Sequence, residues 1–391
     1  MTSCHDRAVR LLNYCLEGQP WPPELLRSLT GDECSDALFR VVAEGLADRF
    51  EPVLCDTYAQ LFAEAIAPHE SAATIEGMVA RYRRVRITRP VTGEPRTVFV
   101  LSRVTLGADV AVTSVILDAA KRRFPEASIY MVGPCKNWEL FAADPRIFHL
   151  PVSYRRGTLR ERLAVGPELR EALAQPESIV IDPDSRLTQL GLLPVCPEER
   201  YYFFESRAYG GDGDDPLPVL ARHWAEQTFG VPDARPFVAV GQASGLSSSG
   251  IAISLGVGEN PAKRIADPFE ADLLALLAKT GLPLTIDQGA GGKEAERVER
   301  AVAQSGAAVR RWNGSFAGFA SIIARSQLYV GYDSAGQHVA AACDVPLISV
   351  FAGFSSPRMF ARWRPAGRVI RVDDPDPARV LQQVRLILSR T

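Results

Sequence analysis

A short stretch in the last third of the chain combines the residue types that bind an anion. After the apolar run at 328–330 it carries, in order, Asp333, Ser334, Ala335, Gly336 and His338. The pattern predicts a strand, a tight turn and a short helix. A helix N-terminus offers free backbone N–H groups and the positive end of the helix dipole, and Ser and His side chains would add donors. The stretch therefore predicts a site for a phosphate-bearing, nucleotide-type ligand at the carboxyl end of a strand.

A glycine-rich segment upstream is a second candidate for contact with this ligand. Residues 255–264 carry two glycines and two bases, Gly256, Gly258, Lys263 and Arg264. Glycines let the backbone approach a ligand closely, and the two bases suit a diphosphate. An ordinary turn with solvated bases is the alternative interpretation. Pro261 stands where a dinucleotide fingerprint requires a third glycine, which disfavours a nicotinamide-dependent dehydrogenase.

Several carboxylates have two interpretations each. Asp109 follows the first predicted strand, where it could take the proton of an acceptor hydroxyl as general base or simply cap the next helix. Glu294 follows a glycine-rich loop and could hold ribose hydroxyls or be a solvated acid at a helix start. Asp182 and Asp184 form a D-x-D pair like that of metal-dependent sugar transferases. Pairs with this spacing are common by chance, and we predict no metal site.

Alternating strand and helix patterns must position these residues. Residues 96–205 and 251–375 each read as a series of short apolar strands and helices, which is typical of parallel α/β sheets. We expect two separate sheets with a cleft between them. The glycine- and serine-rich residues 245–250 suit an interdomain connection.

The first 90 residues show no comparable strand signal. Helical patterns cover residues 8–16, 36–50, 57–67 and 71–84, and prolines follow the first three. This region predicts a separate helical cap or an oligomerisation module. The expected domains are a helical extension over 1–90, an N-terminal α/β domain over 91–235 and a C-terminal α/β domain over 236–391.

Composition narrows the class of protein. The chain has 391 residues, 47% hydrophobic and 23% charged, with a net charge of −2. It shows no basic stripe for nucleic acid, no run of about 18 apolar residues for a membrane span, and no apolar signal region. We therefore expect a cytoplasmic protein. The seven cysteines are scattered, which predicts reduced thiols and neither a disulfide framework nor a zinc site.

Taken together, four segments resemble glycosyltransferase family 9, the ADP-heptose:lipopolysaccharide heptosyltransferase group. The last of them is the most specific, because Gly331-Tyr-Asp-Ser-Ala-Gly-Gln-His338 is similar to the family's G-N-D-[ST]-G-x-x-H signature. The other three are looser: residues 107–125, residues 178–186 and residues 256–264. Ala108 is inserted between Gly107 and the aspartate of the first motif. The resemblance covers about residues 96–391.

The resemblance implies the GT-B fold, in which two Rossmann-like domains with parallel sheets face each other across the active site. It implies an inverting, metal-independent transfer of a sugar from a nucleotide-diphosphate sugar, an ADP-sugar by preference, to a glycan or lipid-linked acceptor in lipopolysaccharide biosynthesis. Asp109 would be the base and Arg186 would lie on the acceptor side. Lys263 would contact the diphosphate, while Asp333, Ser334, Gly336 and His338 would line the donor site.

The resemblance predicts no cofactor, and places the protein in the cytoplasm or peripherally at the inner membrane. Self-association through the helical extension is a further expectation. A non-catalytic nucleotide- or glycan-binding scaffold, whose helical extension recruits a partner, is the alternative function.

Overall fold

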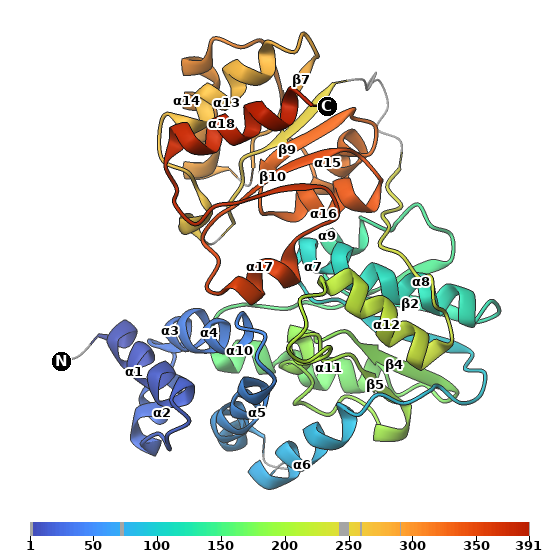
Figure 1. Ribbon diagram of the computed structural model, residues 1–391. Coiled ribbons are helices and arrows are strands. Elements are labelled where there is room, and N and C mark those ends of the chain that lie inside the picture. Colours follow the sequence, from blue (N-terminus) through green and yellow to red (C-terminus); the bar gives the residue numbers. More distant parts are fainter. Residues whose placement is uncertain (1–2, 71–73, 242–249, 259, 290, 391) are drawn as a thin grey trace.

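Two α/β domains and an N-terminal set of helices make up the chain (Figure 1). The computed structural model describes residues 3–70, 74–241, 250–258, 260–289 and 291–390. The predicted interdomain connection at 245–250 lies outside the described residues, except for Gly250. Within the described chain, no helix combines the length and the apolar character that crossing a membrane would require.

The first sheet contains five parallel strands in the order β3-β2-β1-β4-β5. Their bounds are β1 (Thr97–Leu101), β2 (Ser128–Gly133), β3 (Ile147–Pro151), β4 (Ser178–Asp182) and β5 (Tyr201–Phe203). In the central register, Thr97 lies opposite Ser128 on one side and Ser178 on the other. The carboxyl ends of β1 and β4 therefore lie side by side, and the loops after them carry Asp109 and Arg186.

The second sheet contains six parallel strands in the order β11-β10-β9-β6-β7-β8. Their bounds are β6 (Ile251–Ser254), β7 (Leu284–Asp287), β8 (Val309–Trp312), β9 (Leu328–Tyr332), β10 (Leu347–Phe351) and β11 (Arg368–Arg371). The prediction of two separate parallel sheets is confirmed. Strand β9 leads to the predicted anion site, and its neighbour β6 leads to the segment with Lys263.

Helices cover both faces of each sheet. In the N-terminal domain they are α7 (Leu106–Ala108), the π-helical η3 (Asp109–Thr113), α8 (Ser114–Arg123), α9 (Cys135–Trp138), α10 (Leu159–Leu163), α11 (Val165–Ala172), η4 (Arg186–Thr188), η5 (Glu198–Arg200) and α12 (Leu217–Phe229). In the C-terminal domain they are η6 (Pro261–Lys263), α13 (Phe269–Ala278), α14 (Gly292–Ser305), α15 (Phe316–Ile323), α16 (Ala335–Ala342), α17 (Pro357–Trp363) and α18 (Pro377–Leu388).

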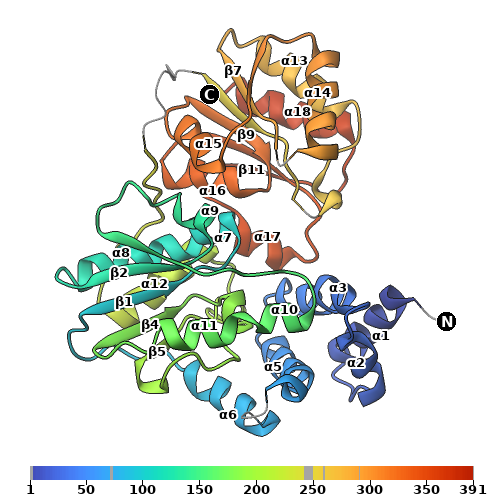
Figure 2. The same ribbon diagram turned by 180° about the vertical axis from the view of Figure 1, so that it is seen from behind.

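An apolar core joins the two α/β domains. Val98 and Val100 of β1 point to the face covered by α8 and α12, because side chains alternate along a strand. The same buried cluster continues through α15 and α16 of the second domain. Helix α16 also packs directly against α7, as both views show (Figures 1 and 2). The N-terminus of α16 is thus placed at the contact between the domains.

The N-terminal helices pack on the opposite face of the first sheet. They are α1 (Cys4–Leu16), α2 (Pro23–Thr30), α3 (Ser35–Ala37), the π-helical η1 (Leu38–Ala43), α4 (Glu44–Ala47), α5 (Pro52–Ile66), η2 (Ala67–His69) and α6 (Ile75–Val85). Phe62 and Tyr82 belong to one buried cluster with Phe99 and Phe203 of the sheet. The expected helices are present and share a buried core with the first domain. The separate helical cap and the oligomerisation module stay predictions. The domain boundary at residue 90 stays a prediction.

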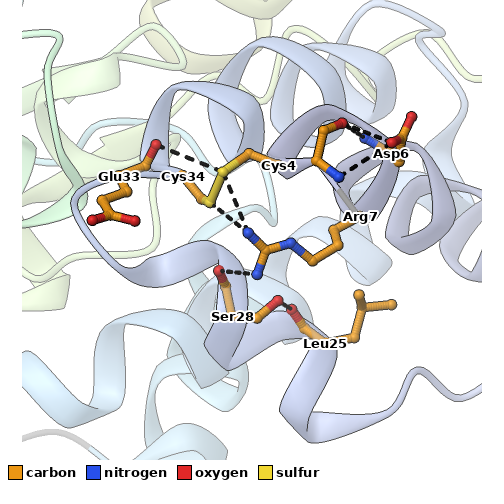
Figure 3. Close-up of a disulfide and its surroundings, with 8 residues drawn as sticks. Cys4, Asp6, Arg7, Leu25, Ser28, Glu33 and Cys34 are labelled. Carbon is orange, nitrogen blue, oxygen red and sulfur yellow. Dashed lines mark hydrogen bonds between the residues drawn. A yellow bond between two sulfur atoms is a disulfide. The ribbon is translucent and has the colours of Figure 1, made fainter. Parts of the chain in front are cut away.

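A disulfide closes the start of this helical extension. Cys4 and Cys34 are bonded, with their Cα atoms 5.3 Å apart, because the first turn of α1 lies beside the turn that precedes α3 (Figure 3). Arg7 lies against the bond, its Nη2 2.9 Å from Cys34 Sγ. The prediction that all seven cysteines are reduced thiols is therefore wrong for this pair, since the sequence separation of 30 hides the contact. The free thiols are Cys15, Cys55, Cys135, Cys196 and Cys343.

Candidate active site

The N-terminus of α16 is open in the way that an anion site requires. Ser334 is the N-cap residue but makes no capping hydrogen bond with its side chain. The first N–H groups of a helix have no partner inside the helix, so the uncapped end keeps donors available. Gly336 is needed here, because a Cβ at this position would lie 2.3 Å from the Tyr329 hydroxyl. Ala335 is the first residue of the helix and adds no functional group of its own.

Asp333 holds a cation at this helix start. Lys263 Nζ lies 2.5 Å from Asp333 Oδ2 and also donates to the Asp333 carbonyl at 3.3 Å. Gln337 Nε2 donates to the other carboxylate oxygen, and Gln337 Oε1 accepts from Ser349 Oγ at 2.5 Å. The chain of contacts fixes the Lys263 ammonium beside the uncapped N-terminus. The structure thus brings together two motifs that are 70 residues apart in sequence.

His338 faces the first domain from the same helix. Its side chain is buried, and a Cβ on Gly107 would lie 3.1 Å from its ring. Burial lowers the pKa of His338 to about 4, against the opposing effect of Asp333. The imidazole is therefore neutral at neutral pH. The Trp363 ring packs edge-on against it, with centroids 5.9 Å apart.

Glu294 lies beneath two glycine-rich loops. A Cβ on Gly256 would lie 2.9 Å from its carboxylate, and one on Gly289 would lie 2.0 Å from it. Both loops can pass over the carboxylate only because they lack side chains at these points. Gly258 adds a positive φ of 58° to the first loop. Burial raises the pKa of the half-buried Glu294. The placement suits a carboxylate that accepts hydrogen bonds from hydroxyl groups.

Arg264 has a different environment from Lys263. Its Nε lies 3.3 Å from Glu270 Oε1, and its Nη2 pairs with Asp267. Glu270 is buried and also pairs with Arg297. This network of ion pairs joins the segment after β6 to α13 and α14. The Arg264 guanidinium therefore helps to hold these elements together. A contact between Arg264 and the donor stays a prediction.

The carboxylate of Asp109 is fully buried and accepts four hydrogen bonds. Its donors are Ser102 Oγ at 2.7 Å, Arg103 N at 2.7 Å, Thr113 Oγ1 at 2.6 Å and Asn137 Nδ2 at 2.6 Å. Burial raises the pKa of Asp109 and these donors lower it. A carboxylate oxygen with two donors has little capacity left for a substrate proton. The geometry is that of an anchor for the loop after β1, and the role of base stays a prediction.

A π-helical turn explains why the Asp109 carboxylate is buried. Residues Asp109–Thr113 form a single π-helical turn between α7 and α8, which is how a helix accommodates an extra residue. The extra residue predicted from sequence is Ala108. It lines the cavity between the helical extension and the domains, whereas Asp109 is not among the described lining residues. The inserted residue thus occupies the cavity wall and Asp109 points into the loop.

This cavity contains residues from three parts of the chain. The helical extension contributes Asp48, the N-terminal domain contributes Arg186, and α17 of the C-terminal domain contributes Trp363. Arg186 was predicted from sequence, while Asp48 and Trp363 were not. They lie outside the family motifs, and no pattern in the first 90 residues indicates a functional carboxylate. Arg186 Nη2 lies 3.8 Å from Glu44 Oε1 on the cavity wall.

Buried arginines form the floor of the cavity. Arg207 Nε lies 3.0 Å from Asp184 Oδ2, and Arg103 Nη1 donates to Ser206 Oγ at 2.8 Å. Arg103 Nε and Arg207 Nη1 have no hydrogen-bond partner in the part of the chain that is described. The sequence analysis missed both arginines, although Arg103 follows directly after the loop-facing end of β1. Unpaired buried donors suit a negatively charged group in the cavity.

The two acids of the D-x-D pair bind other residues of the protein. Asp182 is buried and accepts from Ser185 N at 2.6 Å, Thr188 Oγ1 at 2.5 Å and Tyr201 Oη at 2.5 Å. Burial raises the pKa of Asp182 to about 6. Asp184 is held by Arg207. Neither carboxylate is arranged with further acids or histidines as a metal site among the residues described.

Known proteins match the C-terminal part of the chain in sequence and most of the chain in fold. Residues 262–385 match the model of glycosyltransferase family 9 (heptosyltransferase). The match includes Lys263 and the whole segment Asp333–His338. A comparison with curated protein sequences finds no match.

Solved structures match 75% of the chain. The heptosyltransferase WaaC of E. coli, with ADP-2-deoxy-2-fluoro heptose, has 17% identity and a TM-score of 0.56, covering 75% of this chain and 99% of that one. The ADP-heptose lps heptosyltransferase II of E. coli has 20% identity and a TM-score of 0.52, with coverages of 75% and 99%. The family 9 glycosyl transferase of Veillonella parvula has 18% identity and a TM-score of 0.55, with coverages of 75% and 90%.

These likenesses show the GT-B fold, and the family model adds the donor-side sequence. The chain thus has the GT-B fold with an N-terminal helical extension, and its residues 262–385 are similar to glycosyltransferase family 9.

Proposed function

We propose that the protein is an inverting, metal-independent transferase that moves a sugar from a nucleotide-diphosphate sugar to a hydroxyl acceptor. The observation that carries the proposal is the uncapped N-terminus of α16 with the Lys263 ammonium fixed beside it. Backbone N–H groups and an ammonium are the donors that bind a diphosphate. The WaaC structures contain ADP or an ADP-heptose analogue, which supports an ADP-sugar as donor here.

The donor site would divide into a diphosphate part and a ribose part. Lys263 and Ser334 would contact the diphosphate, and the neutral His338 would donate or accept one hydrogen bond beside it. Glu294, under its two glycine loops, would accept from ribose hydroxyls. As the glycosidic C–O bond breaks, negative charge develops on the departing diphosphate. The helix N-terminus and Lys263 would stabilise this charge, which a metal ion does in other transferases.

The acceptor would enter the cavity of the N-terminal domain. Arg103, Arg186 and Arg207 line this cavity, and two of them carry buried nitrogens without partners among the described residues. A glycan or lipid-linked acceptor with an acidic group would satisfy these donors. Its hydroxyl would then face the donor sugar across the domain contact at Gly107 and Ala335, where a Cβ on Gly107 would lie 3.3 Å from Ala335 Cα.

A binding and turnover screen tests the proposal. Thermal shift with ADP, UDP and GDP should raise the unfolding temperature for one nucleotide, because a ligand that binds only the folded state stabilises it. The matching nucleotide-sugar should then release its nucleotide slowly to water, with or without EDTA. Binding without any turnover would favour the non-catalytic scaffold. Loss of turnover on chelation, with rescue by Mg²⁺ or Mn²⁺, would overturn metal independence.

A further inference from the structure

The cavity contains one carboxylate that the rest of the protein does not use. Three acids line it among the described residues: Glu44, Asp48 and Asp184. Asp184 is bound by Arg207 and Ser206, and Glu44 faces Arg186. Asp48 follows the last turn of α4, where its backbone N–H donates to the Glu44 carbonyl. Within the described chain its side chain has no hydrogen-bond or ion-pair partner, although it is half-buried.

Asp48 also lies close to the donor side. Burial raises the pKa of Asp48 to about 6, with Glu44 and Asp333 adding to this effect and Arg186 and Lys263 opposing it. Arg186 and Lys263 come from the first and second α/β domains respectively. Asp48 lines the same cavity as Trp363, whose ring packs against His338 of α16, so its carboxylate lies between the acceptor cavity and the proposed diphosphate site. Asp109, by contrast, is covered by four donors.

We propose that Asp48, supplied by the helical extension, is the general base that takes the proton from the acceptor hydroxyl. The inference rests on the function proposed above. The acceptor oxygen forms a bond to the anomeric carbon, the bond from that carbon to the diphosphate oxygen breaks, and the diphosphate leaves with the electron pair. The acceptor proton passes to a carboxylate oxygen of Asp48. The extension would then be part of the active site.

The environment of Asp48 suits this task. A base works best when its pKa lies a little below the working pH, because it is then ionised and still basic. The value of about 6 meets this condition near neutral pH. The inserted Ala108 lines the same cavity and carries no carboxylate, and the other two acids of the lining, Glu44 and Asp184, face arginines. Asp48 and Ala108 both line this cavity, whereas Asp109 is not among its described lining residues.

Slow donor hydrolysis gives an assay that needs no acceptor. The preferred sugar from a panel of ADP-, UDP- and GDP-sugars is incubated with the full-length protein, and nucleotide release is followed from pH 5 to 8.5. Wild-type release should rise through an apparent pKa near 6. Asp48→Asn should lower release by about 10²–10⁴-fold and remove this rise, while Asp48→Glu should keep part of both. Calorimetry should give an unchanged affinity for the nucleotide diphosphate.

Matched variants make the outcome specific. Asp36→Asn changes an exposed acid of the extension that pairs with Arg40, and should leave the rate and its pH dependence unchanged. Asp109→Asn should lower the unfolding temperature, because it places an amide among four donors, yet leave the pH profile in place. Normal release by Asp48→Asn, or a pH profile lost only in Asp109→Asn, would overturn the inference alone. A wild-type protein that neither binds nor turns over any of these nucleotides would overturn the proposed function and the inference with it.

Discussion

Lys263 is connected to the second segment of the proposed diphosphate site by a single ion pair. Its ammonium lies 2.5 Å from Asp333 and reaches that residue from a segment 70 positions earlier in sequence. A lysine has three donor hydrogens, and the structure assigns two of them to Asp333. The third remains for a phosphate oxygen. The pair thus positions the cation without consuming its full capacity for hydrogen bonds.

The first prediction concerns this lysine. Lys263→Ala should weaken binding of the preferred nucleotide diphosphate by about 1.5–3 kcal/mol, the usual contribution of a charge-assisted hydrogen bond. Isothermal calorimetry measures the change. Lys279→Ala, which removes an exposed lysine at the end of α13, is the matched control and should leave the affinity unaltered. Equal affinities for Lys263→Ala and wild type would remove Lys263 from the donor site.

His338 makes stability depend on pH. Its pKa is about 4 in the folded protein against an ordinary value of 6.5, so the unfolded chain binds the extra proton first. The stabilising effect is present above pH 6.5 and is lost as the pH falls through 4. Asp182, whose pKa rises to about 6, acts in the opposite sense in this window. A comparison of wild type with a variant at position 338 separates the two effects.

We therefore expect the stability of wild type to fall relative to His338→Gln between pH 6.5 and 4. The uncharged glutamine cannot take up a proton, so it lacks the penalty for charging a buried ring. The difference between the two pKa values, 6.5 and about 4, corresponds to a change in the free energy of unfolding of about 3 kcal/mol at most. Urea unfolding at several pH values measures the difference. Parallel pH dependences for the two proteins would show that His338 titrates freely.

At the level of elements, the short helix α16 is shaped by its contact with strand β9. Tyr329 of β9 lies against the helix start, with its hydroxyl 3.4 Å from Ser334 Oγ. A Cβ at position 336 would lie within 3 Å of three atoms of the tyrosine ring and hydroxyl. The glycine of the motif is thus required by packing before any ligand is considered. If the helix start binds phosphate as proposed, phosphate affinity and local packing would depend on the same residue.

Gly336→Ala should destabilise the protein by about 1–3 kcal/mol, the usual effect of overpacking a tight contact, and should also weaken nucleotide binding. Gly31→Ala is the matched control, because nothing lies within 4 Å of its Cβ position and its φ is −67°. Thermal unfolding with and without ADP measures both effects. A variant at 336 with wild-type stability would mean that the tyrosine ring yields easily.

Elements also show which parts of the fold the sequence could predict. The central strands β1, β4, β6, β9 and β10 are apolar runs buried on both faces, and all five were expected from pattern alone. Strands β5, β8 and β11 are not predicted by this pattern. They lie at sheet edges, and the last two, Val309–Trp312 and Arg368–Arg371, carry two arginines each. An edge strand pairs on one side only and tolerates charge, so it lacks the apolar signal.

The site was predictable where a local motif defines it. The segments around Lys263 and Asp333 could be identified because turn glycines and charged residues are close in sequence. Asp48, Arg207 and the bond between Cys4 and Cys34 depend on contacts between distant segments, which no local pattern records. The burial of Asp109 follows from one extra residue in a helix. The extra residue could be recognised in the sequence, but the π-helical turn that accommodates it could not be predicted.

At the scale of the whole molecule, the extension and the first sheet form one packed unit. Tyr82 of α6 and Phe203 of β5 have ring centroids 6.1 Å apart, and both are buried. Arg86 of the extension pairs with Glu205 at 2.8 Å, and Arg84 pairs with Glu198 at 2.7 Å. Asp48 therefore belongs to a set of helices whose position depends on packing against the first sheet. If the extension supplies the base, its docking must be as firm as that of the domain itself.

This argument leads to a prediction about cooperativity. Phe203→Ala removes a large side chain from the shared core, which costs about 3–5 kcal/mol. Hydrogen exchange followed by mass spectrometry should then show faster exchange in both the N-terminal sheet and helices α5 and α6. Val380→Ala is the contrasting variant, because it lies in a separate core of the second domain. It should speed exchange in α18 and leave α5 and α6 unchanged. If Phe203→Ala accelerates exchange in the sheet while α5 and α6 stay protected, the extension folds on its own, and the helical cap expected from the sequence would describe it better than a shared core.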